Sequence, residues 1–156
     1  MSSTVLVTGA AGYIGSVLVR QLLAAGYRVR GLDALFFGGE SLLGVFGHPR
    51  FEFVRGDLLD PAAAAGALAD VDAVVHLAAI VGDPACAQAP DLAEAVNWDA
   101  TVPLSDRCLA APRLRRFVFA STCSNYGRAA PGEVVDETSP LNPVSLYARL
   151  KVRFEQ

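Results

Sequence analysis

Three side chains in the last third of the chain have the types and spacing needed for proton transfer coupled to hydride transfer. Tyr147 and Lys151 are four residues apart, so on a helix both lie on one face. A phenol has an unperturbed pKa of about 10, and a neighbouring ammonium group lowers it toward the range in which the phenolate acts as a base. Thr122 follows an apolar run and supplies a hydroxyl that can hold a substrate oxygen. Thr122, Tyr147 and Lys151 are therefore the candidate catalytic residues.

A glycine-rich segment near the start of the chain has the composition of a phosphate-binding loop. Gly9, Gly12 and Gly15 follow the apolar run 5–8 and precede a segment with apolar residues at four-residue intervals. A dinucleotide pyrophosphate needs close backbone approach and free N–H groups at a helix N-terminus, and glycines allow both. The spacing GxxGxxG departs from the more common GxGxxG, and tight packing of a helix on a strand also favours glycines. The position between a strand and an amphipathic helix favours dinucleotide binding.

Two acidic residues at predicted strand ends fit the adenosine part of such a ligand. Asp33 ends the second strand about 20 residues after the glycines, where a carboxylate accepts hydrogen bonds from the ribose hydroxyls. The same charge repels a 2′-phosphate, so Asp33 favours NAD over NADP. Asp57 follows the third strand and can accept a hydrogen bond from the adenine amino group. Both aspartates also fit ordinary turns.

The alternation of apolar runs and turn residues predicts the elements that position these side chains. Strands are expected at 5–8, 28–33, 51–54, 73–77 and 116–121, and helices at 13–25, 61–69, 90–111 and from 144 onward. Loops are expected at 36–47, with a short helical turn, and at 124–143. Gly26 is expected to end the first helix, and Pro103 to mark a kink or break in the long one. This order predicts an α/β fold with a doubly wound parallel sheet of the Rossmann type. No repeat or linker divides 1–156, so we expect one domain.

Composition limits the class of protein. Of the 156 residues 53% are hydrophobic and 19% are charged, and the formal net charge is −3. These values fit strands that are covered on both faces, and they give no sign of a nucleic-acid partner or an anionic membrane surface. No stretch reaches the roughly 18 apolar residues of a membrane span, and no signal-peptide pattern precedes the first strand. We therefore expect a cytoplasmic protein.

The remaining reactive side chains have ordinary structural explanations. Cys86, Cys108 and Cys123 are widely spaced, without a CxxC motif or a nearby histidine pair, which argues against a disulfide framework and a metal site. We expect reduced thiols. His76 ends the fourth strand and is expected to pack against backbone rather than to act as an acid or base. The basic run 113–116 is expected to be a solvated loop edge.

Seven segments, taken in order and spacing, resemble the extended short-chain dehydrogenases/reductases, which include NAD-dependent nucleotide-sugar epimerases and dehydratases. They are TGAAGYIG at 8–15, Asp33, GDLLD at 56–60, HLAA at 76–79, Asn97, STCSNYG at 121–127 and YARLK at 147–151. The resemblance implies an NAD-binding Rossmann domain, a nucleotide-sugar substrate and a homodimer. Family members run to about twice this length, so it also implies that further sheet strands and the substrate lobe lie outside this chain.

The resemblance assigns further residues to the cofactor groove. Those that would cap the pyrophosphate, flank the adenine or line the adenosine side are Tyr13, Ile14, Asp57, Leu58, Leu77, Ala78 and Ala79. Tyr147 and Lys151 would also contact the cofactor, with Lys151 holding the nicotinamide ribose. Asn97 would brace the neighbouring backbone or a water molecule.

The run after the fifth strand separates the reaction types of this family. Sugar 4,6-dehydratases resemble STDEVYG there and glucuronate decarboxylases STSEVYG, with carboxylates performing the elimination in the dehydratases. Here Cys123 and Ser124 replace the carboxylates, and Asn125 replaces the usual Val without an evident reason in the sequence. The expected chemistry is therefore epimerisation or ketone reduction by hydride and proton transfer. A dehydratase or decarboxylase, and an NAD-binding module without sugar turnover, are the alternatives.

Overall fold

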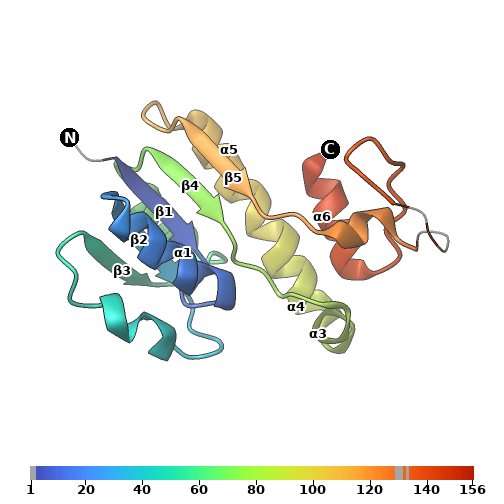
Figure 1. Ribbon diagram of the computed structural model, residues 1–156, viewed down its shortest axis with the longest axis horizontal. Coiled ribbons are helices and arrows are strands. Elements are labelled where there is room, and N and C mark those ends of the chain that lie inside the picture. Colours follow the sequence, from blue (N-terminus) through green and yellow to red (C-terminus); the bar gives the residue numbers. More distant parts are fainter. Residues whose placement is uncertain (1–2, 129–131, 133) are drawn as a thin grey trace. The chain divides into compact units, whose positions relative to one another are not determined.

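The computed structural model describes residues 3–128, 132 and 134–156. The chain forms two compact units, the first made of residues 1–78 and 100–120 and the second of residues 79–99 and 121–156. The first unit holds the sheet and the second holds the C-terminal helix (Figure 1). A single domain over 1–156 stays a prediction.

A five-stranded parallel sheet forms the centre of the first unit (Figure 1). Its strands are β1 (Thr4–Thr8), β2 (Arg28–Asp33), β3 (Phe51–Arg55), β4 (Ala73–His76) and β5 (Arg116–Phe119), in the order β3-β2-β1-β4-β5. The order reverses between β1 and β4, and doubly wound sheets bind ligands at such a point, beyond the carboxyl ends of the strands. The register sets Thr8, at the end of β1, beside Leu32 and His76. The predicted fold class is confirmed.

Helices cover both faces of this sheet, as the apolar strands require. On one face α1 (Tyr13–Ala24) and the 3-10 helix η1 (Glu40–Val45) bury Val5, Val7, Val19, Leu23, Val29, Leu42 and Val45. On the other face α2 (Pro61–Leu68) and α5 (Thr101–Ala110) bury Leu6, Leu32, Ala67, Leu68, Val71, Val74, Leu104 and Cys108. The two cores fix β1 from both sides, and β1 carries the glycine loop.

Gly26 ends α1 as predicted. It has a φ of +93°, a conformation that favours glycine. The Gly26 N–H donates to the Leu23 carbonyl at 3.1 Å, and the Tyr27 N–H donates to the Leu22 carbonyl at 3.0 Å. These two bonds form a Schellman motif, which satisfies carbonyls at the helix end and turns the chain into β2.

The second unit is built from short helices. They are α3 (Asp83–Gln88), α4 (Pro90–Glu94), a π-helix η2 (Ala95–Asp99), a 3-10 helix η3 (Cys123–Tyr126) and α6 (Leu146–Glu155). The helix α6 begins two residues later than predicted because Ser145 caps it, with Oγ accepting the Ala148 N–H at 3.2 Å.

The helix predicted over 90–111 is present as three consecutive segments, α4, η2 and α5, with a break at Ala100. Its hydrogen-bonding pattern changes at the π-helix η2, and α5 begins as a separate helix at Thr101. Pro103, predicted to lie near a kink or break, is the third residue of α5 and comes three residues after the break at Ala100. A proline costs little there, because N–H groups in the first turn of a helix have no intrahelical partner.

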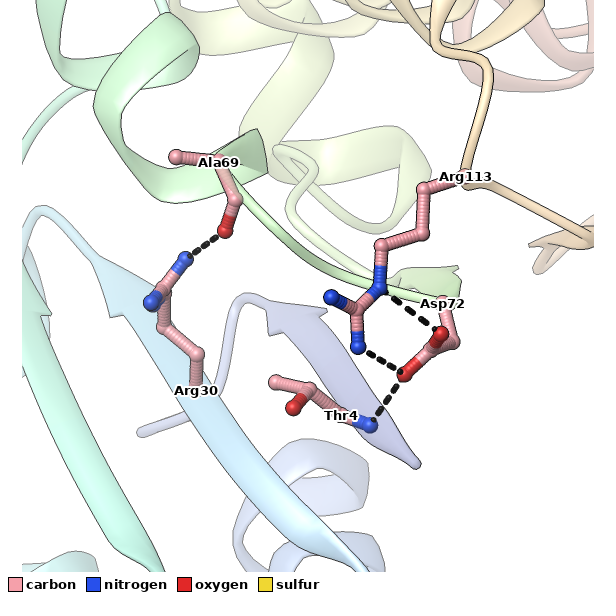
Figure 2. Close-up of polar contacts among 5 residues, drawn as sticks. All are labelled: Thr4, Arg30, Ala69, Asp72 and Arg113. Atoms are coloured by element: carbon pink, nitrogen blue, oxygen red, sulfur yellow. Dashed lines mark hydrogen bonds and ion pairs between the residues drawn. The ribbon is translucent and has the colours of Figure 1, made fainter. Parts of the chain in front are cut away.

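Arginines bind carbonyl and carboxylate groups at the amino ends of the strands. The Asp72 carboxylate accepts the Thr4 N–H at 2.7 Å and two Arg113 N–H groups at 2.9 and 3.3 Å (Figure 2). Arg30 donates to the Ala69 carbonyl at 2.6 Å, at the C-terminal end of α2 where a cation is favourable (Figure 2). Arg113 is exposed in the turn before β5, as the predicted solvated loop edge requires, and it also forms an ion pair with Asp72.

The variant Asp72→Asn should lower stability at neutral pH and weaken its dependence on acid. Hydrogen bonds from Arg113 and Thr4 hold the pKa of Asp72 below its usual range. A carboxyl whose pKa is lowered by folding contributes stability that is complete above its unfolded value of about 4 and is lost as the pH falls through the folded value. Urea unfolding of both proteins at neutral and acidic pH measures this difference.

The matched control for that experiment is Asp70→Asn, which leaves the hydrogen bonds of Asp72 in place. We expect the free energies of unfolding of Asp72→Asn and the natural protein to converge as the pH falls. A difference that stays constant over the whole pH range would contradict the assigned role of Asp72.

The cysteines are free thiols, with Cys86 and Cys108 buried and Cys123 exposed. No cluster of three or more potential metal ligands occurs within 3–128, 132 and 134–156. Over the same ranges, the helices are too short or too polar to cross a lipid bilayer.

Candidate active site

The turn between β1 and α1 has no room for side chains at its glycines. A Cβ on Gly15 would lie 2.1 Å from the Gly9 carbonyl oxygen, and a Cβ on Gly9 would lie 2.8 Å from the Ala78 nitrogen. Gly12 is the N-cap of α1, and no side chain caps the first turn of that helix. Its first N–H groups are therefore left for an acceptor outside the helix, at the positive end of the helix dipole.

Two large side chains at the start of α1 face solvent. Tyr13 is 92% exposed and Ile14 is 61% exposed. Apolar surface of this size beside a row of N–H groups fits a site that a ligand covers, since exposed large apolar groups in a cluster often mark binding surfaces. Their contact with a pyrophosphate stays a prediction.

The Asp33 carboxylate is held in place by two backbone N–H groups. Its Oδ2 accepts from Ala11 at 2.9 Å, and its Oδ1 accepts from Leu35 at 2.8 Å. Each carboxylate oxygen has two lone-pair sites, so one on each oxygen remains for a further donor such as a ribose hydroxyl. The bond to Ala11 also ties the end of β2 to the glycine loop.

Asp57 and Leu58 take part in the turn before α2. The Asp57 Oδ1 accepts the Leu59 N–H at 2.9 Å, and the Asp57 carbonyl accepts the Asp60 N–H at 3.0 Å. Leu58 packs, partly buried, against the core below α2 and α5. These contacts account for Asp57 as a turn residue, and a contact of either residue with adenine stays a prediction.

His76 is buried in a chain of hydroxyl groups. Its Nδ1 lies 2.7 Å from Thr8 Oγ1 and its Nε2 lies 3.0 Å from Thr101 Oγ1, so both ring nitrogens lie beside threonine hydroxyls. Its packing against backbone stays a prediction. Thr8 Oγ1 also accepts the N–H groups of Leu77 and Ala78, each at 3.3 Å. The network therefore holds the segment after β4 in the position where it packs against Gly9. His76 is only 1% exposed, so a substrate cannot contact its side chain in this conformation.

Asn97 lies in the π-helix η2 and braces the backbone of Ile80. Its Oδ1 accepts the Ile80 N–H at 2.8 Å, and its Nδ2 donates to the Ile80 carbonyl at 2.9 Å. Asn97 is buried, and single π-turns often occur at functional sites. Ala79 precedes the braced residue, so Asn97 fixes the end of the HLAA segment. Direct contact of Ala79 or Asn97 with a cofactor stays a prediction.

The three candidate catalytic residues all lie in the second unit. Tyr147 and Lys151 lie on one face of α6 as predicted, 9% and 4% exposed, and Lys151 Nζ is 5.6 Å from the centroid of the Tyr147 ring. Thr122 is the N-cap of η3, and its Oγ1 accepts the Ser124 N–H at 3.2 Å. The helix η3 packs against α6, which brings the Thr122 segment to the helix that carries the other two.

Burial controls the proton affinities of the pair on α6. Desolvation raises the pKa of Tyr147, with a further contribution from Cys86. Desolvation also lowers the pKa of Lys151 to about 8, partly opposed by the charge of Glu155. The expected lowering of the Tyr147 pKa is therefore not found in the chain alone, where Tyr147 is a neutral phenol at neutral pH. A tyrosinate there requires an additional positive charge next to the ring.

Comparison with known proteins places this geometry in a family. A family model described as the NAD dependent epimerase/dehydratase family matches residues 5–156. The UDP-glucose 4-epimerase of Mycolicibacterium smegmatis is 39% identical over 153 residues, which cover 96% of this chain and 48% of that protein. The dTDP-glucose 4,6-dehydratase of Streptomyces griseus is 39% identical over 159 residues, which cover 97% of this chain and 47% of that protein.

A solved structure agrees with the sequence matches. The UDP-glucose 4-epimerase of Thermus thermophilus in complex with NAD superposes with a TM-score of 0.87 at 35% identity, over 97% of this chain and 48% of that chain. The chain thus spans about half the length of the relatives it matches. The cofactor of the family is NAD. The chain belongs to the NAD-dependent epimerase/dehydratase family of extended short-chain dehydrogenases/reductases.

Proposed function

We propose that this chain is the cofactor-binding part of an NAD-dependent nucleotide-sugar epimerase, or of a ketoreductase that uses the same hydride transfer. The observation that carries the proposal is the buried Tyr147 and Lys151 pair on α6, in the same compact unit as Thr122. Acid–base catalysis uses buried titratable groups of this kind, and the pair on one helix face shares a compact unit with the Thr122 hydroxyl.

The residues of the first unit fit NAD. The uncapped first turn of α1 offers N–H donors to a pyrophosphate. Because Gly9, Gly12 and Gly15 have no side chains, the pyrophosphate can approach the backbone there. The free lone pairs of Asp33 fit the hydroxyls of the adenosine ribose. When bound, the oxidised nicotinamide supplies a hydride acceptor and a positive charge.

The residues of the second unit account for the proton. In our proposal the Tyr147 phenolate accepts the proton of a sugar hydroxyl while the hydrogen on the same carbon leaves as hydride, which leaves a ketone. Thr122 holds the reacting oxygen, and Lys151 binds the nicotinamide ribose and stabilises the phenolate. Return of the hydride to the opposite face of the ketone, with the proton returned by Tyr147, gives the epimer. A ketoreductase performs only the second half of this sequence.

The side chains after β5 favour epimerisation or reduction over dehydration. Overall identity does not distinguish these reactions, because an epimerase and a dehydratase are both 39% identical to the chain. Dehydration removes a proton from one carbon and expels water from another, so it needs an additional acid and base. The positions at which the family's dehydratases carry carboxylates are Cys123 and Ser124 here.

Incubation with nucleotide sugars tests the proposed function. The protein expressed from its full reading frame is mixed with NAD and a panel of UDP-, dTDP- and GDP-sugars, and the products are followed by NMR of the anomeric protons. We expect conversion of at least one sugar to its epimer, or reduction of a keto-sugar when NADH is supplied. Formation of a 4-keto-6-deoxy sugar would identify a dehydratase instead. NAD binding without any conversion would overturn the proposal in favour of a binding module.

The variant Asp33→Asn should weaken NAD binding and reduce discrimination against NADP. Hydrogen bonds to a charged acceptor contribute about 1.5–3 kcal/mol, so the dissociation constant for NAD should rise about ten- to a hundredfold. The affinity for NADP should not fall in parallel, because the repulsion of the 2′-phosphate is removed. Calorimetric titration of both cofactors measures the ratio, with Asp70→Asn, in the turn before β4, as the control. An unchanged ratio of the two affinities would show that Asp33 does not contact the ribose.

A further inference from the structure

The side chain of Asn125 joins the run 121–127 to the helix that carries Tyr147 and Lys151. Asn125 is 4% exposed. Its Nδ2 donates to Ser121 Oγ at 2.9 Å and to Glu155 Oε1 at 3.0 Å. One amide group therefore connects the start of the run to the last turn of α6.

The backbone of Asn125 extends this connection. Its N–H donates to the Thr122 carbonyl at 3.3 Å, and its carbonyl accepts the Asn142 N–H at 2.8 Å. Gly127 packs so closely on Asn142 that a Cβ on Gly127 would lie 2.2 Å from the Asn142 carbonyl oxygen. Asn125 is thus the residue at which the Thr122 segment, the Asn142 segment and α6 meet.

Asn125 keeps this position at a cost to stability. Its Oδ1 is buried and has no hydrogen-bond partner within the part of the chain that the structure describes. An unpaired buried acceptor is unfavourable, and turning the amide round would place Oδ1 against the Glu155 carboxylate, which is worse. An apolar residue at 125 would avoid this cost but would form neither of the two side-chain hydrogen bonds. Costs of this kind concentrate at functional sites.

We propose that Asn125 is a positioning residue, which holds Thr122 at a fixed place relative to Tyr147 and Lys151 by bridging Ser121 and Glu155. Thr122 is the neighbour of Ser121, and Glu155 lies about one helical turn beyond Lys151. The inference rests on the proposed function and gives a reason for the departure from the Val that is usual in the family. Val has no donor, so it cannot form either hydrogen bond.

The variant Asn125→Val separates positioning from stability. Because a misplacement of about 1 Å at a reacting group can cost a hundredfold in rate, we expect kcat to fall about ten- to a hundredfold. The dissociation constant for NAD should stay unchanged, since the glycine loop and Asp33 are intact. The thermal midpoint should change little, because the loss of two hydrogen bonds is offset by removal of the unpaired buried carbonyl. A residue with only a structural role would give the opposite pattern, with a lower midpoint and unchanged kcat.

A reversed hydrogen bond provides the rescue. In Asn125→Asp the new carboxylate faces Glu155 and donates no hydrogen bond, so kcat should fall at least as far as in Asn125→Val. Adding Glu155→Gln supplies an amide that donates to Asp at 125, and Ser121 can donate its hydroxyl, so the double variant should recover most of the lost kcat. Glu155→Gln alone is the matched control, because the Gln carbonyl still accepts from Asn125.

The outcomes distinguish this inference from the proposed function. If the unmodified protein converts sugars and Asn125→Val converts them equally fast, the inference is overturned and the proposed function stands. Failure of the double variant to recover kcat would also overturn it. If the unmodified protein converts no sugar, the proposed function fails, and amide hydrogen exchange then tests the bridge. Exchange at 121–127 should be faster in Asn125→Val and restored in the double variant, and unchanged exchange would overturn the inference.

Discussion

The variant Tyr147→Phe should lower kcat by about a hundred- to ten-thousandfold, which is the usual contribution of a positioned acid or base. The ring of Phe keeps the contacts that Tyr147 makes with Cys86 and Ala93, so only the hydroxyl is lost. Stability and the dissociation constant for NAD should therefore change little. Steady-state turnover of the nucleotide sugar, calorimetric titration of NAD and thermal unfolding measure the three quantities.

The matched control for this variant is Tyr27→Phe, which removes a phenol hydroxyl just after α1. It should turn over sugar at the rate of the unmodified protein. Unchanged turnover in Tyr147→Phe would show that another group moves the proton. A large loss of NAD binding would show instead that the hydroxyl serves mainly to hold the cofactor.

The variant Gly15→Ala should both destabilise the first unit and remove most of its affinity for NAD. The added methyl group would lie 2.1 Å from the Gly9 carbonyl oxygen and 2.9 Å from Ala10 Cα, and both are backbone atoms that cannot turn aside. The helix α1 must then move away from the turn. Overpacking of this kind costs about 1–3 kcal/mol. The N–H groups at the start of α1 would move with the helix, so we expect the dissociation constant for NAD to rise by about tenfold or more.

A second helical glycine supplies the control for Gly15→Ala. Gly66 lies in α2, and no atom approaches within 4 Å of the position of its Cβ. Because Ala is the better helix former, Gly66→Ala should raise stability by about 0.5–1 kcal/mol and leave NAD binding unchanged. Urea unfolding and calorimetric titration measure both effects. A Gly15→Ala protein with unaltered stability and NAD affinity would show that the close packing of the glycine loop is not required.

The parts of the fold and site that depend on residues close together in the sequence could be predicted from the sequence. Alternating apolar runs and turns are local patterns, so the strands, the glycine loop, the stop at Gly26 and the common helix of Tyr147 and Lys151 followed from them. The position of Asp33 at the end of β2 followed in the same way. Each of these features can be predicted from the spacing of apolar residues along one helix or strand, or from the residue at which that element ends.

The hydrogen-bond partners could not be predicted, because the fold brings them together from distant positions. Thr8 and Thr101 reach His76 from 68 and 25 residues away. The bonds of Asp72 to Arg113 and of Asn125 to Glu155 span 41 and 30 residues. No local pattern selects one acidic or hydroxyl partner among many for such pairs.

The direction of the Tyr147 pKa shift could not be predicted for a related reason. The spacing of Tyr147 and Lys151 indicates that an ammonium group is near the phenol, which on its own would lower the pKa. The depth of burial decides the sign, and it depends on the packing of α6 on Cys86 and Ala93. We therefore expect the pKa of Tyr147 to fall when oxidised NAD is bound, and we do not expect Lys151 alone to lower it.

The most direct test of the central claim is to follow the absorbance of reduced nicotinamide after a nucleotide sugar is mixed with the protein and NAD. The protein expressed from its full reading frame should show reduced nicotinamide before or together with the epimer, and Tyr147→Phe should show neither at a comparable rate. Epimer formation with no reduced nicotinamide at any time would contradict the account. So would epimer formation by Tyr147→Phe at the rate of the unmodified protein.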